Sequence, residues 1–318
     1  MATFGARRSG MIATIGAPDD ASAVFHNPAG LADQPGIQLY FFLSPGIVDP
    51  RFRLQAHDPT LYPEINPKGC DQDNSCPWPI DDEGYYEETI TADRSFGIQP
   101  FLAVTTDLGF ISPAAKDVVV ALAVFAPNAY AAYLPEDAPT AYHVIGGLFL
   151  VGTATLGVGY RPHPKIALGA SISYNYMHIS LSQKMSAVDA LTPPGQSPTA
   201  LASMAQGLVG DIRMDFSGVD HGVGWSAALL LNPEPWIGLG ITYSGATHPR
   251  FRGDVSLYGT KEIAKDPDDF RSVVEGVGYK LPDELEIQMP IPHSLAFGLN
   301  LKLAWWIEVG FEGRFWFY

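Results

Sequence analysis

The histidines, the side chains best suited to acid–base catalysis and metal binding, lie scattered along this sequence. There are eight, and five of them fall in separate predicted elements: His26, His143, His163, His178 and His221. None has a partner at the spacing of metal ligands. The sequence also lacks the G-x-S-x-G, P-loop, G-x-G-x-x-G and H-E-x-x-H motifs. We therefore predict no enzyme activity, no metal site, no catalytic residue and no cofactor.

The two cysteines, Cys70 and Cys76, stand close together in the polar stretch GCDQDNSCPWP. A disulfide closing this short loop would fit an oxidising compartment, and we predict one. The alternative is a pair of free surface thiols. Asp71 and Asp73 have a loose calcium-loop spacing, but Cys76 occupies the position where such a loop needs glycine. Calcium binding is therefore not predicted.

The charge balance argues against nucleic acid as a partner. The chain has 19 Lys and Arg against 34 Asp and Glu, a net charge of -15, and no basic stripe to neutralise phosphates. Abundant glycine (32) and proline (27), with only 17% charged residues, favour strands joined by turns over helices or disorder. No apolar run reaches the 18 residues that a membrane helix needs, so only a barrel of strands could span a bilayer.

An alternation of period two recurs along the chain. In the segment 165–176, KIALGASISYNY, Ile166, Leu168 and Tyr174 share an apolar face, while Gly169 and Ser171 share a small, polar one. The segments 148–160, 237–244, 295–303 and 305–312 alternate in the same way. This pattern fits either a soluble β-sandwich or a membrane barrel whose polar face lines a lumen.

Three details favour the barrel. The segments are about ten residues long, as tilted membrane strands are. Their ends carry aromatics such as Tyr160, Trp236 and Trp305, as interfacial girdles do. Lys302 and Glu308 suit a wet lumen better than a dry core. We count ten or eleven strands, joined by short turns at 161–164 and 232–235 and by long excursions at 49–93, 127–140, 182–206 and 259–290.

Two of the long excursions carry apolar residues at helical spacing. These candidates for a substrate groove are Leu191, Leu201, Met204, Leu208, Phe270, Val273 and Val274, and Asp266 or Asp268 could cap the second helix. Exposed apolar helices at a barrel mouth could receive a hydrophobic ligand. Equally, they could pack on one another and only close the loops.

The N-terminal segment reads GARRSGMIATIGAPDDASAVFHNPAGLAD from Gly5 to Asp33 and has no strand pattern. Its Gly-rich start, its Asp-Asp-Ala-Ser-Ala element and its Asn-Pro-Ala-Gly-Leu turn resemble the start of mature FadL-family outer-membrane transporters, which include transporters of aromatic hydrocarbons. The segments 222–254 and 290–303 also resemble paired strands of that family. The resemblance covers nearly the whole chain.

The resemblance implies a fourteen-stranded transmembrane antiparallel barrel in the outer membrane. Residues 1–36 would be a hatch inside its lumen, with Asn27, Pro28, Ala29 and Gly30 as the fixed gating turn, and residues 37–318 would form the wall. Because fewer strands are counted and no signal peptide precedes the chain, we expect both ends to be truncated.

The implied function is passive uptake of hydrophobic compounds, most simply long-chain fatty acids, by a monomer surrounded by outer-membrane lipid. Arg213, Arg250 and Arg252 are candidate partners for a carboxylate. Aromatic hydrocarbons would need the same apolar lining, so they remain an alternative substrate. A structural or adhesive barrel and an outer-membrane lipase, which would need a Ser–His pair, are further alternatives.

Overall fold

The computed structural model describes residues 5–55, 80–87, 89–192, 199–281 and 284–318. The predicted Cys70–Cys76 disulfide lies outside these residues. Among the described residues, no helix is both long enough and apolar enough to cross a bilayer. The helices are α1 (Ala6–Met11), α2 (Ala23–His26), α4 (Ala187–Leu191), α5 (Ala200–Val209) and α6 (Pro267–Gly276), with a 3-10 helix η1 (Pro28–Asp33) after α2.

Strands make up most of the described chain. They are β1 (Ile37–Val48), β2 (Arg51–Phe52), β3 (Ile90–Thr91), β4 (Ser95–Asp107), β5 (Val118–Tyr133), β6 (Gly146–His163), β7 (Ile166–Ser186), β8 (Asp211–Glu234), β9 (Ile237–Ser244), β10 (Arg250–Gly259), β11 (Glu284–Gln288), β12 (His293–Ala304) and β13 (Ile307–Phe317).

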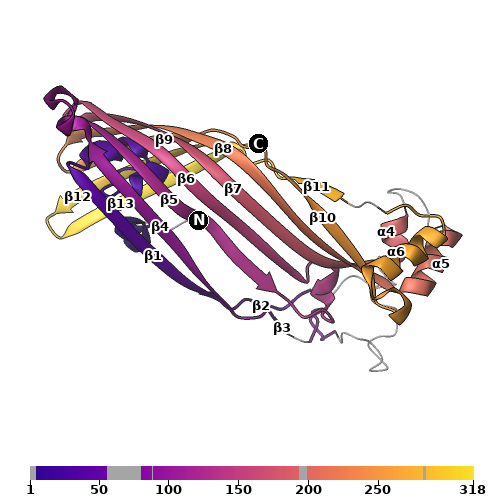
Figure 1. Ribbon diagram of the computed structural model, residues 1–318. Coiled ribbons are helices and arrows are strands. Elements are labelled where there is room, and N and C mark those ends of the chain that lie inside the picture. Colours follow the sequence, from indigo (N-terminus) through magenta and orange to yellow (C-terminus); the bar gives the residue numbers. More distant parts are fainter. Residues whose placement is uncertain (1–4, 56–79, 88, 193–198, 282–283) are drawn as a thin grey trace.

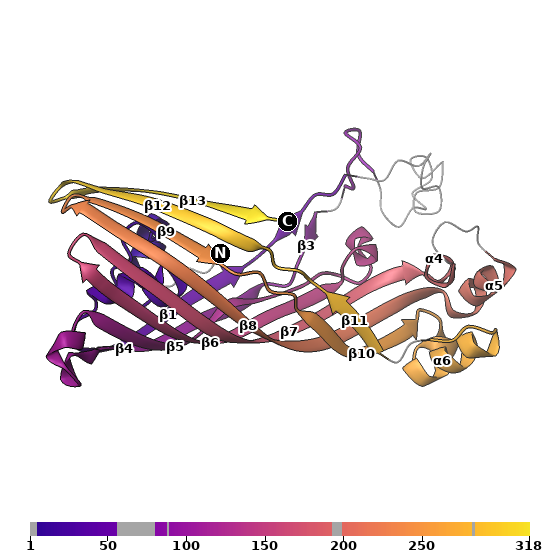
Figure 2. The same cartoon turned by 90° about the horizontal axis from the view of Figure 1, so that it is seen from above.

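Eleven of the strands in the described part form one sheet with the order β1-β4-β5-β6-β7-β8-β9-β12-β13, and β10 pairs with β8 and β11. All of these pairs are antiparallel. The sheet is long and strongly curved (Figures 1 and 2). The predicted all-β class and the predicted number of strands agree with this sheet.

The two ends of the sheet differ in their connections. At one end, which we call the turn end, tight turns join β6 to β7, β8 to β9 and β12 to β13. The other, which we call the helix end, carries α4, α5 and α6 (Figure 1). The predicted excursions 127–140 and 182–206 are wrong in their first parts, because β5 continues to Tyr133 and β7 to Ser186, and the excursion 259–290 contains the strand β11. Pro127 of β5 interrupts the ladder without ending the strand.

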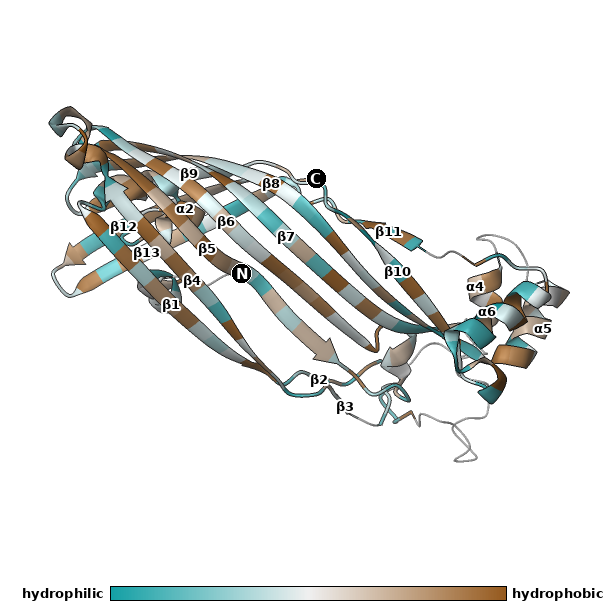
Figure 3. Ribbon diagram, viewed as in Figure 1, coloured by the Kyte–Doolittle hydropathy of each residue, from teal (hydrophilic) through white to brown (hydrophobic). Residues whose placement is uncertain are grey.

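Near the turn end, side chains alternate as the sequence predicts. Ile172 and Tyr174 of β7 are 53% and 52% exposed on the outer face. The inner face carries hydroxyl and amide pairs between neighbouring strands: Thr155 with Ser173 and Ser171 with Ser226, each at 2.8 Å. Brown and pale bands alternate along these strands in Figure 3. This is the arrangement of a barrel with a lipid-facing outside and a polar inside.

Toward the helix end, the two faces of β7 and β8 exchange polarity. The outer face becomes polar beyond Tyr176, where His178 bonds to Ser217 (3.1 Å). The inner face becomes apolar, with Met177 and Phe216 buried in one cluster. Because side chains still alternate regularly, the change lies in residue type and not in register. The parts of β7 and β8 nearest the helix end therefore have a polar outer face and an apolar inner face, as a soluble sheet does.

Candidate functional site

Residues 5–36, which we call the N-terminal segment, lie inside the curve of the sheet near its turn end (Figures 1 and 2). The 3-10 helix η1 contacts β6, β7 and β8, and α2 contacts β6. Val24 of α2 and Leu31 of η1 are fully buried, and so is Ile15, which lies against Gly240 and Gly298 of the sheet. The segment that the sequence singled out thus fills part of the space that the inner face encloses.

Asn27 fixes the turn at the centre of the N-terminal segment. Its side-chain Oδ1 accepts a hydrogen bond from the Ala29 N–H (3.1 Å), and its Nδ2 donates to the carbonyl of Ile15 (2.7 Å). Asn27 and Ala29 are completely buried, and Thr242 of β9 donates to the carbonyl of His26 (3.1 Å). The predicted turn therefore holds two parts of the segment together and ties them to the wall.

Glycines on the inner face let the N-terminal segment approach the wall closely. A Cβ added at Gly240 would lie 1.7 Å from the Ile15 carbonyl oxygen, and one at Gly169 would lie 2.1 Å from the Ala29 nitrogen. Gly159 and Gly298 have similar backbone contacts with the segment. These glycines of the alternating pattern therefore form the surface on which the N-terminal segment packs, which we call the glycine footprint. The pattern alone did not reveal this.

Ion pairs join the N-terminal segment to β13. Arg7 contacts Asp19 and Glu308, each at 2.8 Å, and Arg8 contacts Glu312 at 2.7 Å. Burial alone would lower the pKa of Arg7, but its bonds to Glu308 and Asp19 outweigh burial and raise it. Arg8 and Glu312 are largely shielded from solvent, so separating them would leave a buried charge.

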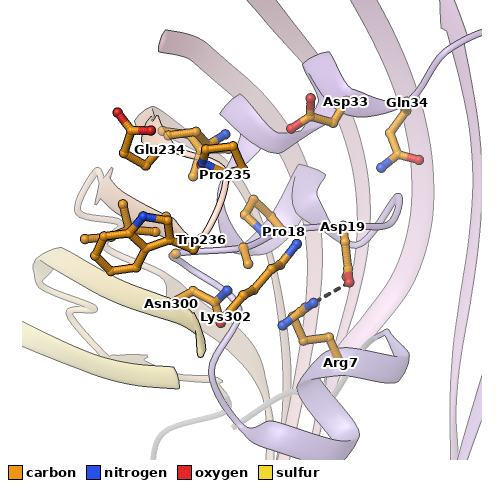
Figure 4. A pocket seen from close by; sticks show the side chains of 16 residues that line it. Arg7, Pro18, Asp19, Asp33, Gln34, Glu234, Pro235, Trp236, Asn300 and Lys302 are labelled. Carbon is orange, nitrogen blue, oxygen red and sulfur yellow. Dashed lines mark hydrogen bonds and ion pairs between the residues drawn. The ribbon is translucent and has the colours of Figure 1, made fainter. Parts of the chain in front are cut away.

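A polar pocket of about 350 Å³ lies between the N-terminal segment and the turn end of β8, β9 and β12. Figure 4 shows Arg7 and Asp19 of the segment, bonded to each other, on one side of it, and Asn300 and Lys302 of β12 beside them. Trp236 lies at the adjacent turn. Both positively and negatively charged side chains line this pocket, so its lining does not favour ligands of one charge sign.

Aromatic rings connect α2 with β4 and β5. Phe25 packs edge-on against Phe125 with ring centroids 5.3 Å apart, and Phe125 stacks on Phe101 at 5.4 Å. Phe42 of β1 extends this cluster. The N-terminal segment therefore touches the wall at the pair Phe101–Phe125, which is also the last pair between β4 and β5.

Beyond this pair, β4 and β5 separate. In the described ladders, Ser95 to Pro100 pair with β1, and Asn128 to Tyr133 pair with β6. Pro127 has no N–H to donate to β4. The strands meet again where Ser95 Oγ donates to the Ala131 carbonyl (3.1 Å). We call the gap between the Phe101–Phe125 pair and this Ser95–Ala131 hydrogen bond the side window. A space of about 620 Å³ lies along it.

An inner cavity of about 250 Å³ lies behind the side window. Val24 and Phe25 of the N-terminal segment and Pro127 of the side window line it, together with Arg314 of β13 and the polar side chains Ser171, Ser173, Asn175, Ser226 and Ser294. Arg314 Nε is buried and has no hydrogen-bond partner among the described residues. The cavity thus offers hydroxyl groups and one guanidinium group.

Comparison with known proteins decides the family. Over residues 9–316 the sequence matches the family described as outer membrane protein transport protein (OMPP1/FadL/TodX). The chain belongs to this family. The FadL-type resemblance is thereby confirmed, and with it the outer-membrane location and the transmembrane β-barrel class of fold. No curated protein sequence matches the chain.

Solved structures of FadL-type proteins have the same fold. A Pseudomonas aeruginosa FadL homologue matches with a TM-score of 0.68 at 15% identity, covering 96% of this chain and 67% of that one. The Ralstonia pickettii toluene transporter TbuX matches with a TM-score of 0.59 at 15% identity, covering 93% and 66%. The Pseudomonas putida toluene transporter TodX matches with 0.59 at 18%, covering 96% and 67%. The chain spans about two thirds of the length of each.

Most of the groove residues predicted for this FadL-family chain come together at the helix end. Phe270 and Val274 are fully buried, and Leu191, Leu208 and Val273 pack against them. Met204 is 56% exposed, and the side chain of Leu201 lies outside the described part. Thr199 caps α5 and Asp266 caps α6 through their side-chain oxygens. The residues therefore pack mainly on one another.

The three arginines proposed as carboxylate partners do not form one site. Arg213 pairs with Glu136 and Asp215, Arg252 pairs with Glu286 at 2.7 Å, and Arg250 is exposed on β10. Sequence reasoning missed Arg314, because the surroundings that leave its Nε without a partner among the described residues come from strands far apart in the chain. No group of three or more potential metal ligands occurs among the described residues.

Proposed function

We propose that the chain forms a passive outer-membrane channel for hydrophobic compounds. The N-terminal segment acts as its hatch, and residues 37–318 form its wall. The buried turn at Asn27, the glycine footprint and the ion pairs to β13 support this division. Each holds the N-terminal segment on the inner face without making it part of the sheet.

The proposed route runs from the helix end to the side window. A hydrophobic molecule enters beside the apolar residues of α5 and α6, passes the apolar inner cluster around Met177 and Phe216, and reaches the inner cavity. It leaves sideways into lipid through the side window, whose rim at Phe125 touches Phe25 of the hatch. Because Phe25 lines the cavity and also contacts the rim, a movement of the hatch changes both.

Long-chain fatty acids are the substrates that the inner cavity fits best. The observation that carries this is the buried Nε of Arg314, unpartnered among the described residues and beside serine hydroxyls that line the cavity. A carboxylate would complete a charge-assisted hydrogen bond there. Aromatic hydrocarbons are the second candidate, since two of the similar structures are toluene transporters, but a hydrocarbon has no group for Arg314.

Uptake of two labelled substrates tests this assignment. We expect Arg314→Gln to lower oleate uptake by about tenfold or more, since hydrogen bonds to charged groups contribute about 1.5–3 kcal/mol, and to leave toluene uptake unchanged. Arg252→Gln is the matched control, because Arg252 is paired with Glu286 on the outer face. Unchanged oleate uptake in a stably inserted Arg314→Gln protein would remove Arg314 from the site, and uptake of toluene alone would favour the hydrocarbon channel.

A further inference from the structure

A second interruption of the wall lies between β8 and the strands β9 and β10. Ser226 of β8 pairs with Ser244 of β9, and Val219 pairs with Arg252 of β10. Residues 245–249, which connect β9 to β10, leave the ladder between these pairs. The next strand is interrupted at the same level, by residues 289–292 between β11 and β12. Both connections are visible in Figure 2.

Both connections contain prolines: Pro249 lies in the one beside β8, and Pro290 and Pro292 lie in the next one. Pro249, Pro290 and Pro292 have no N–H to donate. The two connections bond to each other instead, since Thr247 and Ile291 exchange both backbone hydrogen bonds (3.0 and 2.8 Å). These bonds hold the two connections together as a pair.

The contacts with β8 at the two ends of this break are sparse. At one end the Gly245 N–H donates to the Trp225 carbonyl (3.0 Å). At the other, the Arg250 N–H bonds to the side chain of Asp220 (2.7 Å) and not to its backbone. A side-chain acceptor can swing away without disturbing the neighbouring strand β7. The break can therefore widen while β8 keeps its full ladder with β7.

The inner cavity extends to this break. Gly224 and Trp225 of β8 line it, and so do Gly245, Ile291 and Pro292 of the two connections. The cavity therefore reaches both interruptions of the wall, the side window at Pro127 and the break at Gly245.

The indole of Trp225 lies at one end of the break. A Cβ added at Gly245 would lie 2.3 Å from Trp225 Nε1, so the ring rests directly on this glycine. The ring is also tilted against Tyr243, with centroids 5.4 Å apart, and Trp225 is half exposed on the outer face. The Trp225 ring thus lies over Gly245, at the edge of the inner cavity.

We propose that this break is a second opening of the wall, gated by the Trp225 indole, that admits hydrophobic molecules from the outer part of the surrounding lipid into the inner cavity. The Asp220 end of the break supports the direction, because it lies at the level where the outer face changes from apolar to polar, between Tyr176 and His178 on β7. Such a level corresponds to a membrane boundary. The proposal rests on the proposed function, since it gives the same cavity a second access.

Labelling of a cysteine in the cavity tests the opening without requiring transport. Ser294→Cys, 5% exposed in the native protein, is introduced into the full chain with Cys70→Ser and Cys76→Ser, and the protein is placed in lipid vesicles with a bilayer-soluble pyrene maleimide. We expect Trp225→Ala to accelerate labelling about tenfold, equivalent to about 1.4 kcal/mol of opening free energy, and Trp225→Phe to accelerate it less.

Ile172→Ala is the matched control. Ile172 faces Trp225 across the intact β7–β8 ladder and is equally exposed, so its truncation should leave the labelling rate unchanged. Gly224→Leu, whose Cβ meets Asn175 at an ordinary 3.4 Å, should slow labelling by filling the inner mouth of the opening.

The outcomes separate this opening from the proposed function. Equal labelling rates in the Trp225 variants and in the Ile172 control, with normal oleate uptake, would overturn the opening alone. A response to Trp225→Ala in a protein that takes up no oleate would support the opening and overturn the proposed function.

Discussion

The closest contact between the N-terminal segment and the wall gives the sharpest prediction. In Gly240→Ala, the added Cβ would stand 1.7 Å from the Ile15 carbonyl oxygen, whereas ordinary contacts begin at 3.4 Å. Ile15 must therefore move by about 1.7 Å, the difference between these distances. Strand β9 keeps its place, because it is paired with β8 on one side and β12 on the other.

The expected cost follows from the contacts that this movement breaks. The 2.7 Å hydrogen bond from Asn27 to Ile15 is lost, and a buried polar group without a partner costs about 1–3 kcal/mol. Partial exposure of the fully buried Ile15 adds up to about 1.5–3 kcal/mol. A total near 3 kcal/mol would raise the population of the detached segment about a hundredfold.

Hydrogen exchange read by mass spectrometry measures this population. We expect peptides from residues 5–36 to lose protection in Gly240→Ala, while peptides from β6 to β8 keep theirs. Gly152→Ala is the matched control, because a Cβ at Gly152 meets no atom within 4 Å. If the N-terminal segment remained as protected in Gly240→Ala as in Gly152→Ala, the close contact would not hold it in place.

Two further predictions concern charged and polar contacts. Glu312→Gln removes the carboxylate that Arg8 contacts in a largely buried ion pair, and we expect weaker attachment of the N-terminal segment, seen as faster exchange there. Unchanged exchange would mean that the pair does not hold the segment. Tyr142 donates to Asp211 (2.7 Å), and burial, then this bond, raises the pKa of Tyr142 above its usual value. The stability from Tyr142 should therefore be complete below about pH 10, the ordinary tyrosine pKa, and should fall as the pH rises through the raised pKa. In Tyr142→Phe the melting temperature should fall less steeply above pH 10; identical slopes would contradict the assignment.

The alternating segments could be predicted from the sequence because side-chain alternation is local. Ile172 and Ser173 reveal opposite faces without any knowledge of their neighbours. What fills the inner face could not be predicted in the same way. Gly240 and Gly298 looked like small lumenal positions, and only the distances to Ile15 show that they accommodate the N-terminal segment.

Features that depend on pairing between strands were harder to predict. Pro127 was predicted to begin a long excursion, and proline is indeed rare inside paired strands. The structure instead keeps β5 paired with β6 and loses only the partner β4, which creates the side window. Arg314 lacked any local signal, because its surroundings come from strands far apart in the chain, such as β8 and β13.

The change of polarity along β7 and β8 bears on which substrates the proposed route suits. Coming from the helix end, a molecule first meets the apolar inner cluster around Met177 and Phe216 and only then the hydroxyl-lined cavity with Arg314. An alkyl chain gains from burial in the first region, at about 0.8 kcal/mol per CH₂ group, and a carboxylate gains from the second. An acid entering head first can satisfy both regions at once if its chain is long enough to reach back from Arg314 to Phe216. Uptake should therefore rise with chain length and then level off, and in Arg314→Gln the dependence on length should persist while uptake falls for every length. A dependence on length that vanished together with Arg314 would mean that the apolar cluster contributes nothing on its own, and the route through it would be refuted.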